Sequence, residues 1–102
     1  MPMLKDLFLG FVKTHILYHA SRGPIYGVEM LEELARHGYR LSPGTLYPTL
    51  HRLEQDGYLS AQRRVVDGKM RRYYTITQPG QEILDEAKQR IAELANEVLL
   101  DG

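Results

Sequence analysis

The sequence of 102 residues contains no cysteine, which excludes disulfide bonds, thiolate metal sites and a cysteine nucleophile. It also contains no tryptophan. No apolar run approaches the roughly 20 residues that a membrane-spanning helix needs. The apolar amino-terminal stretch is interrupted by Asp6 and Lys13, so it is not a secretory signal. We therefore expect a cytoplasmic protein without a membrane partner, built as one domain with a modest core.

The formal net charge is zero, which at first argues against a nucleic-acid ligand, but the charges are unevenly distributed. Residues 58–77 carry a net charge of +4, and residues 81–102 carry a net charge of −4. Binding of a polyanion depends on the local potential rather than on the total charge. The basic segment is therefore the candidate contact surface, and the acidic segment is expected to point elsewhere.

Apolar residues at three- and four-residue intervals predict two helices in the first third of the chain. The first spans Leu4–Ser21 and is apolar around most of its circumference, and the second spans Tyr26–His37. The side of the second helix that should face inward comprises Val28, Leu31, Leu34 and Ala35.

A third helix is predicted from an N-cap at Ser42 to a stop at Gly57. Its buried stripe consists of leucines spaced at i, i+4 and i+7, namely Leu46, Leu50 and Leu53. Pro48 is unusual, because a proline inside a helix costs about 3 kcal/mol and bends the axis.

Two runs of strand-forming residues follow, Tyr58–Val66 and Met70–Thr77, and the Asp-Gly between them is a strong hairpin signal. A last helix is predicted from Gln81 to about Leu100. The fold class is therefore mainly α with a β-hairpin (α+β). It corresponds to a winged helix-turn-helix DNA-binding domain over residues 1–78 and a C-terminal dimerisation helix over residues 79–102, forming one compact unit.

Three stretches carry a specific resemblance: I-Y-G-V-E-M-L-E-E-L, S-P-G-T-L-Y-P-T-L-H-R-L-E-Q-D-G-Y-L and R-R-Y-Y-T-I-T-Q-P-G. They closely resemble the PadR family of transcriptional regulators, and the resemblance covers nearly the whole chain. It implies a recognition helix with Thr45, Tyr47, Pro48 and Arg52 facing a DNA groove, a supporting helix that opens at Tyr26, and a basic wing on the phosphate backbone. It also implies pairing through the final helix. Many family members are repressors released by a small ligand, several by aromatic ligands near the dimer interface. This chain resembles the short subgroup with one C-terminal helix, and it has no tryptophan for such a ligand site.

The residues expected to contact double-stranded DNA come from the second helix, the recognition helix and the wing. They are Tyr26, Ser42, Thr45, Tyr47, Pro48, Thr49, His51, Arg52, Arg63, Arg64, Lys69, Arg71 and Arg72. An α-helix fits the major groove, where base edges form a readable pattern, and basic wing residues release counterions from phosphates. Strand alternation places Arg71 and Arg72 on opposite faces, so we expect that at least one of them does not contact DNA.

Each of these features also has a simpler interpretation. A polar helix face can simply meet water, and a charged edge hairpin can serve to resist aggregation. The alternative function is a protein-interaction or dimerisation module on the same scaffold, with weak or lost DNA binding. The near-neutral pI keeps that alternative open.

The terminal helix has an apolar 3-4-3-4 spacing typical of a coiled-coil seam, which predicts a homodimer. The predicted interface comprises Leu4, Phe8, Phe11, Leu84, Ala87, Ile91, Leu94, Ala95 and Val98. If a small-molecule effector binds, the resemblance and the surplus of apolar residues favour a pocket across the dimer, lined by Phe8, Phe11, His15, Ile91 and Leu94.

His15 and His19 lie at i, i+4 on the first helix, a spacing that can chelate a metal. Zinc sites usually have three or four protein ligands, and no third ligand is evident, so we predict neither a metal site nor a cofactor. No nucleophile elbow, phosphate-binding glycine loop or catalytic carboxylate pair is present either. The sequence therefore does not predict an enzyme.

Overall fold

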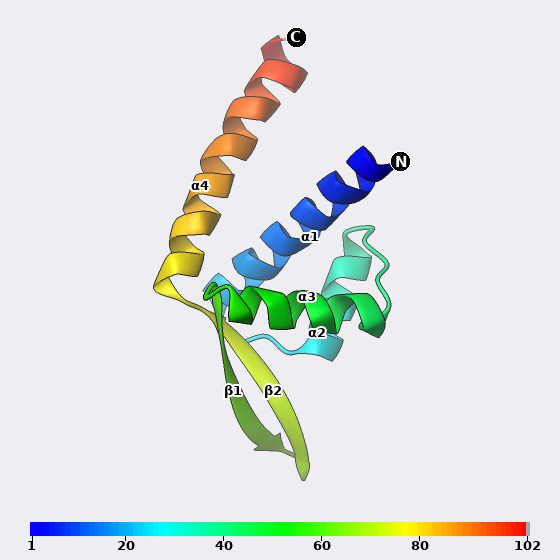
Figure 1. Cartoon of the computed structure of the whole chain (residues 1–102), viewed down its shortest axis with the longest axis vertical. Coiled ribbons are helices and arrows are strands. Elements are labelled where there is room, and N and C mark those ends of the chain that lie inside the picture. The colour runs from blue at the N-terminus through cyan, green and yellow to red at the C-terminus, as the bar shows by residue number, and fades with distance from the viewer. Residues whose placement is uncertain (102) are drawn as a thin grey trace.

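A computed structural model describes residues 1–101 and confirms the α+β class, with four helices and one antiparallel hairpin (Figure 1). The elements in chain order are α1 (Pro2–Arg22), α2 (Gly27–Arg36), α3 (Pro43–Gln55), β1 (Leu59–Val66), β2 (Lys69–Ile76), α4 (Gln78–Ala95) and a widened final turn, η1 (Asn96–Asp101). The molecule measures 54 × 29 × 21 Å. Its long axis runs from the far end of α4 to the tip of the hairpin. Within residues 1–101, no helix combines the length and apolarity needed to cross a bilayer.

The core lies where α1, α2 and α3 meet the base of the hairpin. Its members are Val12, Ile16, Leu17, Ala20, Ile25, Met30, Leu34, Leu46, Leu50, Leu53, Leu59, Tyr74 and Leu84. The predicted leucine stripe of α3 is confirmed, because all three leucines are buried. The prediction for Val28 is wrong, since this side chain is 52% exposed on the side of α2 that faces β2.

The two strands are joined by a two-residue turn, Asp67-Gly68, rather than by the three residues expected. Both turn residues have positive φ, 52° and 75°, as the tight hairpin turns that match strand twist require. Ile25 extends the sheet by a backbone bridge to Tyr74, with N–O distances of 2.9 and 2.7 Å. The hairpin is therefore held to the segment that leads into α2.

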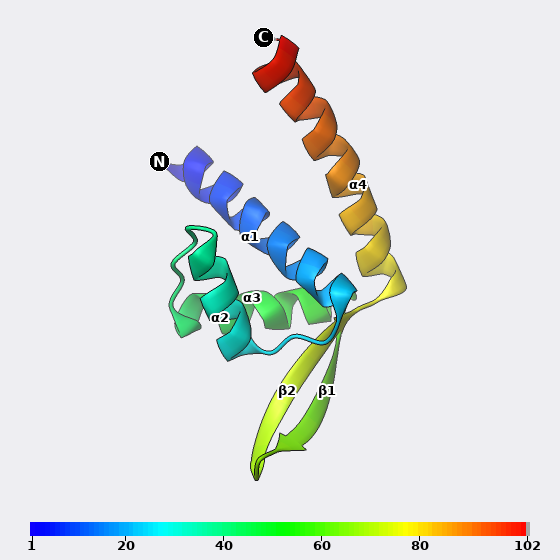
Figure 2. The same cartoon turned by 180° about the vertical axis from the view of Figure 1, so that it is seen from behind.

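The helices α1 and α4 diverge from the core as two arms, which are seen from both sides of the molecule (Figure 1, Figure 2). α4 begins three residues earlier than predicted, because the hydroxyl of Thr77 accepts a hydrogen bond from the backbone N–H of Gly80 at 3.0 Å. Pro79 fits this first turn, where a helix needs no N–H donor. The start of α4 is thereby fixed directly against the end of β2.

Gly80→Ala should destabilise the protein, by about 1–3 kcal/mol as for other overpacked sites. A Cβ at this position would overlap the backbone carbonyl of Tyr58 and the side chain of Ile76. Urea unfolding followed by circular dichroism measures the change. Gly10→Ala is the matched control, because a Cβ there meets no atom within 4 Å, and it should be neutral or stabilising. Equal stability of the two variants would contradict this packing.

Candidate nucleic-acid interface

The recognition helix α3 presents its polar side away from the core. Thr45, Tyr47, Pro48, His51 and Arg52 are exposed, and Thr49 is half-buried. Ser42 occupies the N-cap as expected, but its side chain caps no backbone N–H, and its hydroxyl instead lies 3.4 Å from that of Thr45. These predicted contact residues therefore form one accessible face.

Pro48 does not interrupt α3, which is continuous from Pro43 to Gln55. A proline supplies no N–H to the carbonyl four residues before it, here that of Gly44. Pro48 and Gly44 are both exposed, so water can satisfy this carbonyl. The missing hydrogen bond therefore leaves no buried polar group unpaired at this position.

The polar face of α3 is largely neutralised within the chain. Nε of Arg52 lies 3.2 Å from an oxygen of Asp56, and Nδ1 of His51 lies 3.8 Å from an oxygen of Glu54. The Arg52 side chain is 70% exposed, and exposed ion pairs contribute little energy, so the guanidinium can exchange this partner for another. α3 can supply specific contacts, but it contributes little net positive charge.

Arg72 connects the wing to the recognition helix. Its Nη2 donates a hydrogen bond to Glu54 of α3 at 2.7 Å, and its guanidinium lies 5.8 Å from the centre of the Tyr74 ring. Burial raises the pKa of Tyr74. The guanidinium of Arg72 is therefore engaged within the chain, and its expected contact with DNA stays a prediction.

The hairpin register places like charges opposite each other. Arg63 pairs with Arg72, and Arg64 pairs with Arg71 on the other face. Like charges directly opposite on a sheet are destabilising. Within residues 1–101, none of Arg63, Arg64, Lys69 or Arg71 forms an ion pair with a carboxylate. The wing therefore keeps a positive potential that a polyanion would neutralise.

Aromatic rings support two of these arginines. The guanidinium of Arg71 lies 4.8 Å from the ring centre of Tyr26, and that of Arg64 lies 5.2 Å from the ring centre of Tyr73. The two tyrosine rings are themselves 5.3 Å apart. A hydrogen bond with the Tyr73 hydroxyl is the main cause that raises the pKa of Arg71. The predicted residue Tyr26 thus acts as a platform for a wing arginine.

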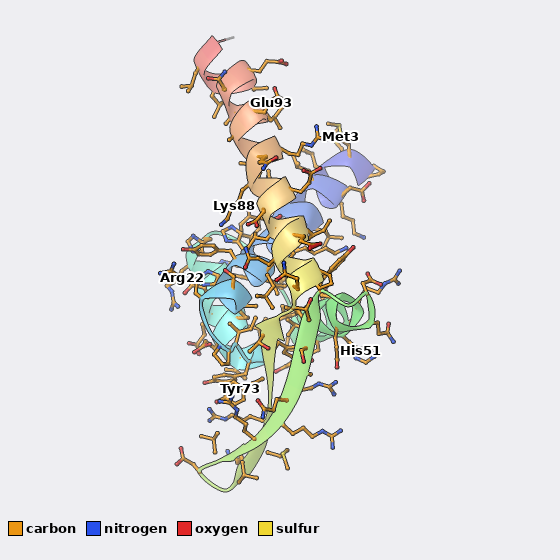
Figure 3. All side chains as sticks on the ribbon, turned by 90° about the vertical axis from the view of Figure 1, so that its left-hand side faces the viewer. Met3, Arg22, His51, Tyr73, Lys88 and Glu93 are labelled. Carbon is orange, nitrogen blue, oxygen red and sulfur yellow. The ribbon has the colours of Figure 1, made fainter. Side chains whose placement is uncertain are left out.

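A cleft of about 530 Å³ joins the start of α2, α3 and β2. It brings together five predicted residues: Tyr26, Tyr47, Lys69, Arg71 and Arg72. Gly27 makes this possible, because a Cβ at that position would overlap the Tyr47 ring. Val28 and Met70 also line the cleft and were not predicted; an apolar residue close to the hairpin turn was the only signal for Met70 in the sequence. In Figure 3, Tyr73 of the hairpin and His51 of α3 are labelled on opposite sides of the hairpin, and nitrogen-tipped side chains project from the wing.

The two arms carry exposed apolar side chains at many of the positions predicted to form a dimer. Leu4, Phe11, Ile91, Leu94 and Val98 are all exposed, and Ala87 and Ala95 are half-buried. The prediction that Leu84 lies in the dimer interface is wrong, because this residue is 1% exposed and belongs to the core of its own chain.

The predicted ligand pocket across the dimer stays a prediction. Within the single chain, a cavity of about 430 Å³ has a lining that includes Phe11, His15 and Ile91 but neither Phe8 nor Leu94. Phe8 packs instead against Tyr39, with ring centres 4.9 Å apart.

A recognition helix, a supporting helix and a basic wing that share one cleft define a winged helix-turn-helix DNA-binding protein. Comparison with known proteins identifies the family: residues 16–86 match the Transcriptional regulator PadR-like family, and the chain belongs to that family. It is 54% identical to the transcriptional regulator Rv3488 of Mycobacterium tuberculosis, over 86% of this chain and 82% of that protein.

Solved structures agree with this assignment. A PadR-like transcriptional regulator from Bacillus cereus superposes with a TM-score of 0.84 at 33% identity, covering 95% of this chain and 98% of that one. A PadR family regulator from Eggerthella lenta superposes with a TM-score of 0.80 at 32% identity, covering 95% and 86%. These relatives are regulators of transcription rather than enzymes, which confirms the expectation that the chain is not an enzyme.

Proposed function

We propose that the protein is a cytoplasmic homodimeric repressor that binds a pseudo-palindromic operator and is released from it by a small effector. In this proposal α3 enters the major groove, and the wing follows the adjacent phosphates. The two recognition helices are related by the two-fold axis of the dimer, at a spacing of about 34–36 Å, one turn of DNA. The observation that carries the DNA contact is the wing, where two consecutive cross-strand pairs are Arg–Arg and gain a counter-charge on binding a polyanion.

The proposed dimer rests on the apolar faces of the arms. Exposed side chains of α4 and η1 recur at a 3-4 spacing through Ile91, Leu94 and Val98, and α1 adds Leu4 and Phe11. Contiguous apolar patches of this kind on a small protein mark interaction sites. A second copy with the same patch would cover both arms at once, as two-fold symmetry requires.

Two measurements on the full chain test this proposal together. The mass of one chain is 11.8 kDa, and light scattering should give twice this mass. A gel shift on the DNA upstream of the protein's own reading frame should give one complex containing two chains, which persists with excess unrelated DNA. A monomeric mass, or equal binding to unrelated DNA, would contradict the proposal.

Arg52→Ala should lower the affinity for the operator by about 5- to 150-fold, because a bidentate arginine–guanine contact contributes about 1–3 kcal/mol of discrimination. Binding to unrelated DNA and the dimer mass should change little. The matched control is Arg90→Ala, which removes an arginine from a similar i, i+4 ion pair on α4, with Glu86 at 3.6 Å. If both variants bind the operator equally well, Arg52 does not read bases. Fluorescence anisotropy with labelled operator measures both.

The second candidate function is an interaction module with weak DNA binding. It is favoured by the pairing of Arg52 with Asp56 and of Arg72 with Glu54 on α3, and by the zero net charge. The dependence of DNA affinity on salt separates the two candidates, because such a module would release few counterions from DNA.

A further inference from the structure

The region where α1 meets the end of α2 contains three of the four histidines of the chain. His15 and His19 lie one turn apart on α1, and His37 is the C-cap of α2. One ring nitrogen from each lies within 4.8 Å of the others. His37 is the third ligand that was not evident in the sequence, because the fold alone brings it to the α1 pair.

A carboxylate adjoins this cluster. An oxygen of Glu33 lies 2.9 Å from Nε2 of His37 and 3.7 Å from Nε2 of His19. The other oxygen accepts a hydrogen bond from Arg36 at 2.6 Å, which is the largest of the effects that lower the pKa of Glu33. Carboxylate partners in this position orient metal-binding imidazoles.

We propose that His15, His19 and His37 bind a divalent transition-metal ion of the Zn²⁺ class, with Glu33 as the carboxylate beside them. Three imidazoles favour Zn²⁺, Co²⁺ or Ni²⁺ over Mg²⁺ and Ca²⁺, which prefer oxygen ligands. The nearby cations, Arg36 and Lys88, also disfavour a purely electrostatic site for a hard cation.

Only small side-chain movements are needed to bring the three imidazoles to the distances of a zinc site. Zn–N bonds of about 2.0–2.1 Å in a tetrahedral site bring ligand nitrogens to about 3.4 Å from one another, closer than the present limit of 4.8 Å. The rings of His15 and His37 are stacked, with centres 4.8 Å apart and planes 25° apart, so they must rotate for their lone pairs to converge. The side chain of His37 is 46% exposed and is free to do so.

The position of the site allows a bound metal to regulate DNA binding. This regulatory role rests on the proposed function. A bound ion would join α1, an arm of the proposed dimer, to the end of the helix that supports α3. The cluster also lines the cavity of about 430 Å³, to which α4 contributes Leu84, Lys88 and Ile91. Figure 3 labels Lys88 on α4. A metal there would change how the arms sit relative to the recognition helix, and hence the affinity for operator DNA.

Metal binding is tested without DNA, on the untagged full chain after treatment with a chelator. Calorimetric titration with ZnCl₂ should give one ion per chain, and Co²⁺ should give the absorption bands of a tetrahedral site. His37→Asn should weaken Zn²⁺ binding by more than about 100-fold, and Glu33→Gln by about 10- to 100-fold. His51→Asn is the matched control for metal binding, because it removes the one histidine outside the cluster. No zinc binding by the wild type, or equal binding by His37→Asn, would overturn the site.

A second experiment tests the regulatory use separately. Zinc should change the operator affinity of the wild type by at least about fivefold, and it should not change that of His37→Asn. If zinc binds but the operator affinity stays constant, the regulatory part is wrong and the metal site stands. If the wild type binds zinc but no DNA at all, it is the proposed function that fails. Unchanged far-ultraviolet circular dichroism verifies that His37→Asn is folded.

Discussion

Replacing both Arg64 and Arg71 by alanine is expected to lower the affinity for operator DNA by about 10²- to 10³-fold at about 0.15 M salt. These residues face each other across the hairpin on the side opposite Arg63 and Arg72, and neither is paired with a carboxylate within residues 1–101. In a dimer the change removes four phosphate contacts, each of which adds about 0.9 to the slope of log K against log salt. Fluorescence anisotropy at several salt concentrations measures both the affinity and the slope.

The control for this variant removes the same charge elsewhere. Lys5 and Lys13 are exposed on α1, far from the wing in sequence, and their double alanine variant should bind DNA within about threefold of the wild type. Equal losses in the two double variants would mean that overall charge, rather than the wing, determines the affinity.

Leu94→Asp is expected to dissociate the dimer and thereby to reduce DNA binding. Leu94 is 56% exposed on the arm of α4, and a second chain would bury it. An unpaired carboxylate in such an interface costs several kcal/mol, and the substitution occurs once in each subunit. The dissociation constant of the dimer should therefore rise by about 10³-fold or more. A single subunit loses the linked second half-site, so the operator affinity should fall by about 10²-fold or more.

Sedimentation or light scattering across a concentration series measures this change. Gln89→Asp adds the same charge at an exposed position of α4 outside the apolar seam, and it should leave the dimer intact. A tight dimer of the Leu94→Asp variant would show that the interface lies elsewhere.

The features that sequence predicted well are those determined by local pattern. The periodicity of the leucines was sufficient to predict the buried stripe of α3, and the Asp-Gly pair was sufficient to predict the hairpin. Both depend on residues a few positions apart, whose geometry is nearly independent of the rest of the chain. The family resemblance rested on the same stretches and is confirmed by the match over residues 16–86.

The features that were missed depend on contacts between distant segments. Val28 was predicted to be buried, but the side of α2 that carries it faces the cleft at β2. Leu84 was assigned to a second subunit, although its own α1 and core already cover it. His37 lies 18 residues from His19, and only the packing of α1 on α2 brings the two together. Periodicity shows which side of a helix is apolar, but it does not show which element covers that side.

The charges on α3 show that contacts between distant segments are hard to predict at the candidate site as well. The sequence sets Arg52 and His51 of the α3 face against Glu54 and Asp56, and so it predicts a weakly basic face with most of the positive charge on the hairpin. It does not show that Glu54 accepts a hydrogen bond from Arg72 of the wing. The division of roles that follows, with specificity from α3 and affinity from the wing, is the central claim of the account.

The slope of log K against log salt for the wild-type chain on its operator tests that claim most directly. With Arg63, Arg64, Lys69 and Arg71 contacting phosphates in both subunits, the slope should be about −7. It should shrink by about 3.6 in the Arg64→Ala/Arg71→Ala variant and stay unchanged in Arg90→Ala. A slope near zero, or one that the wing variant leaves unchanged, would contradict the account.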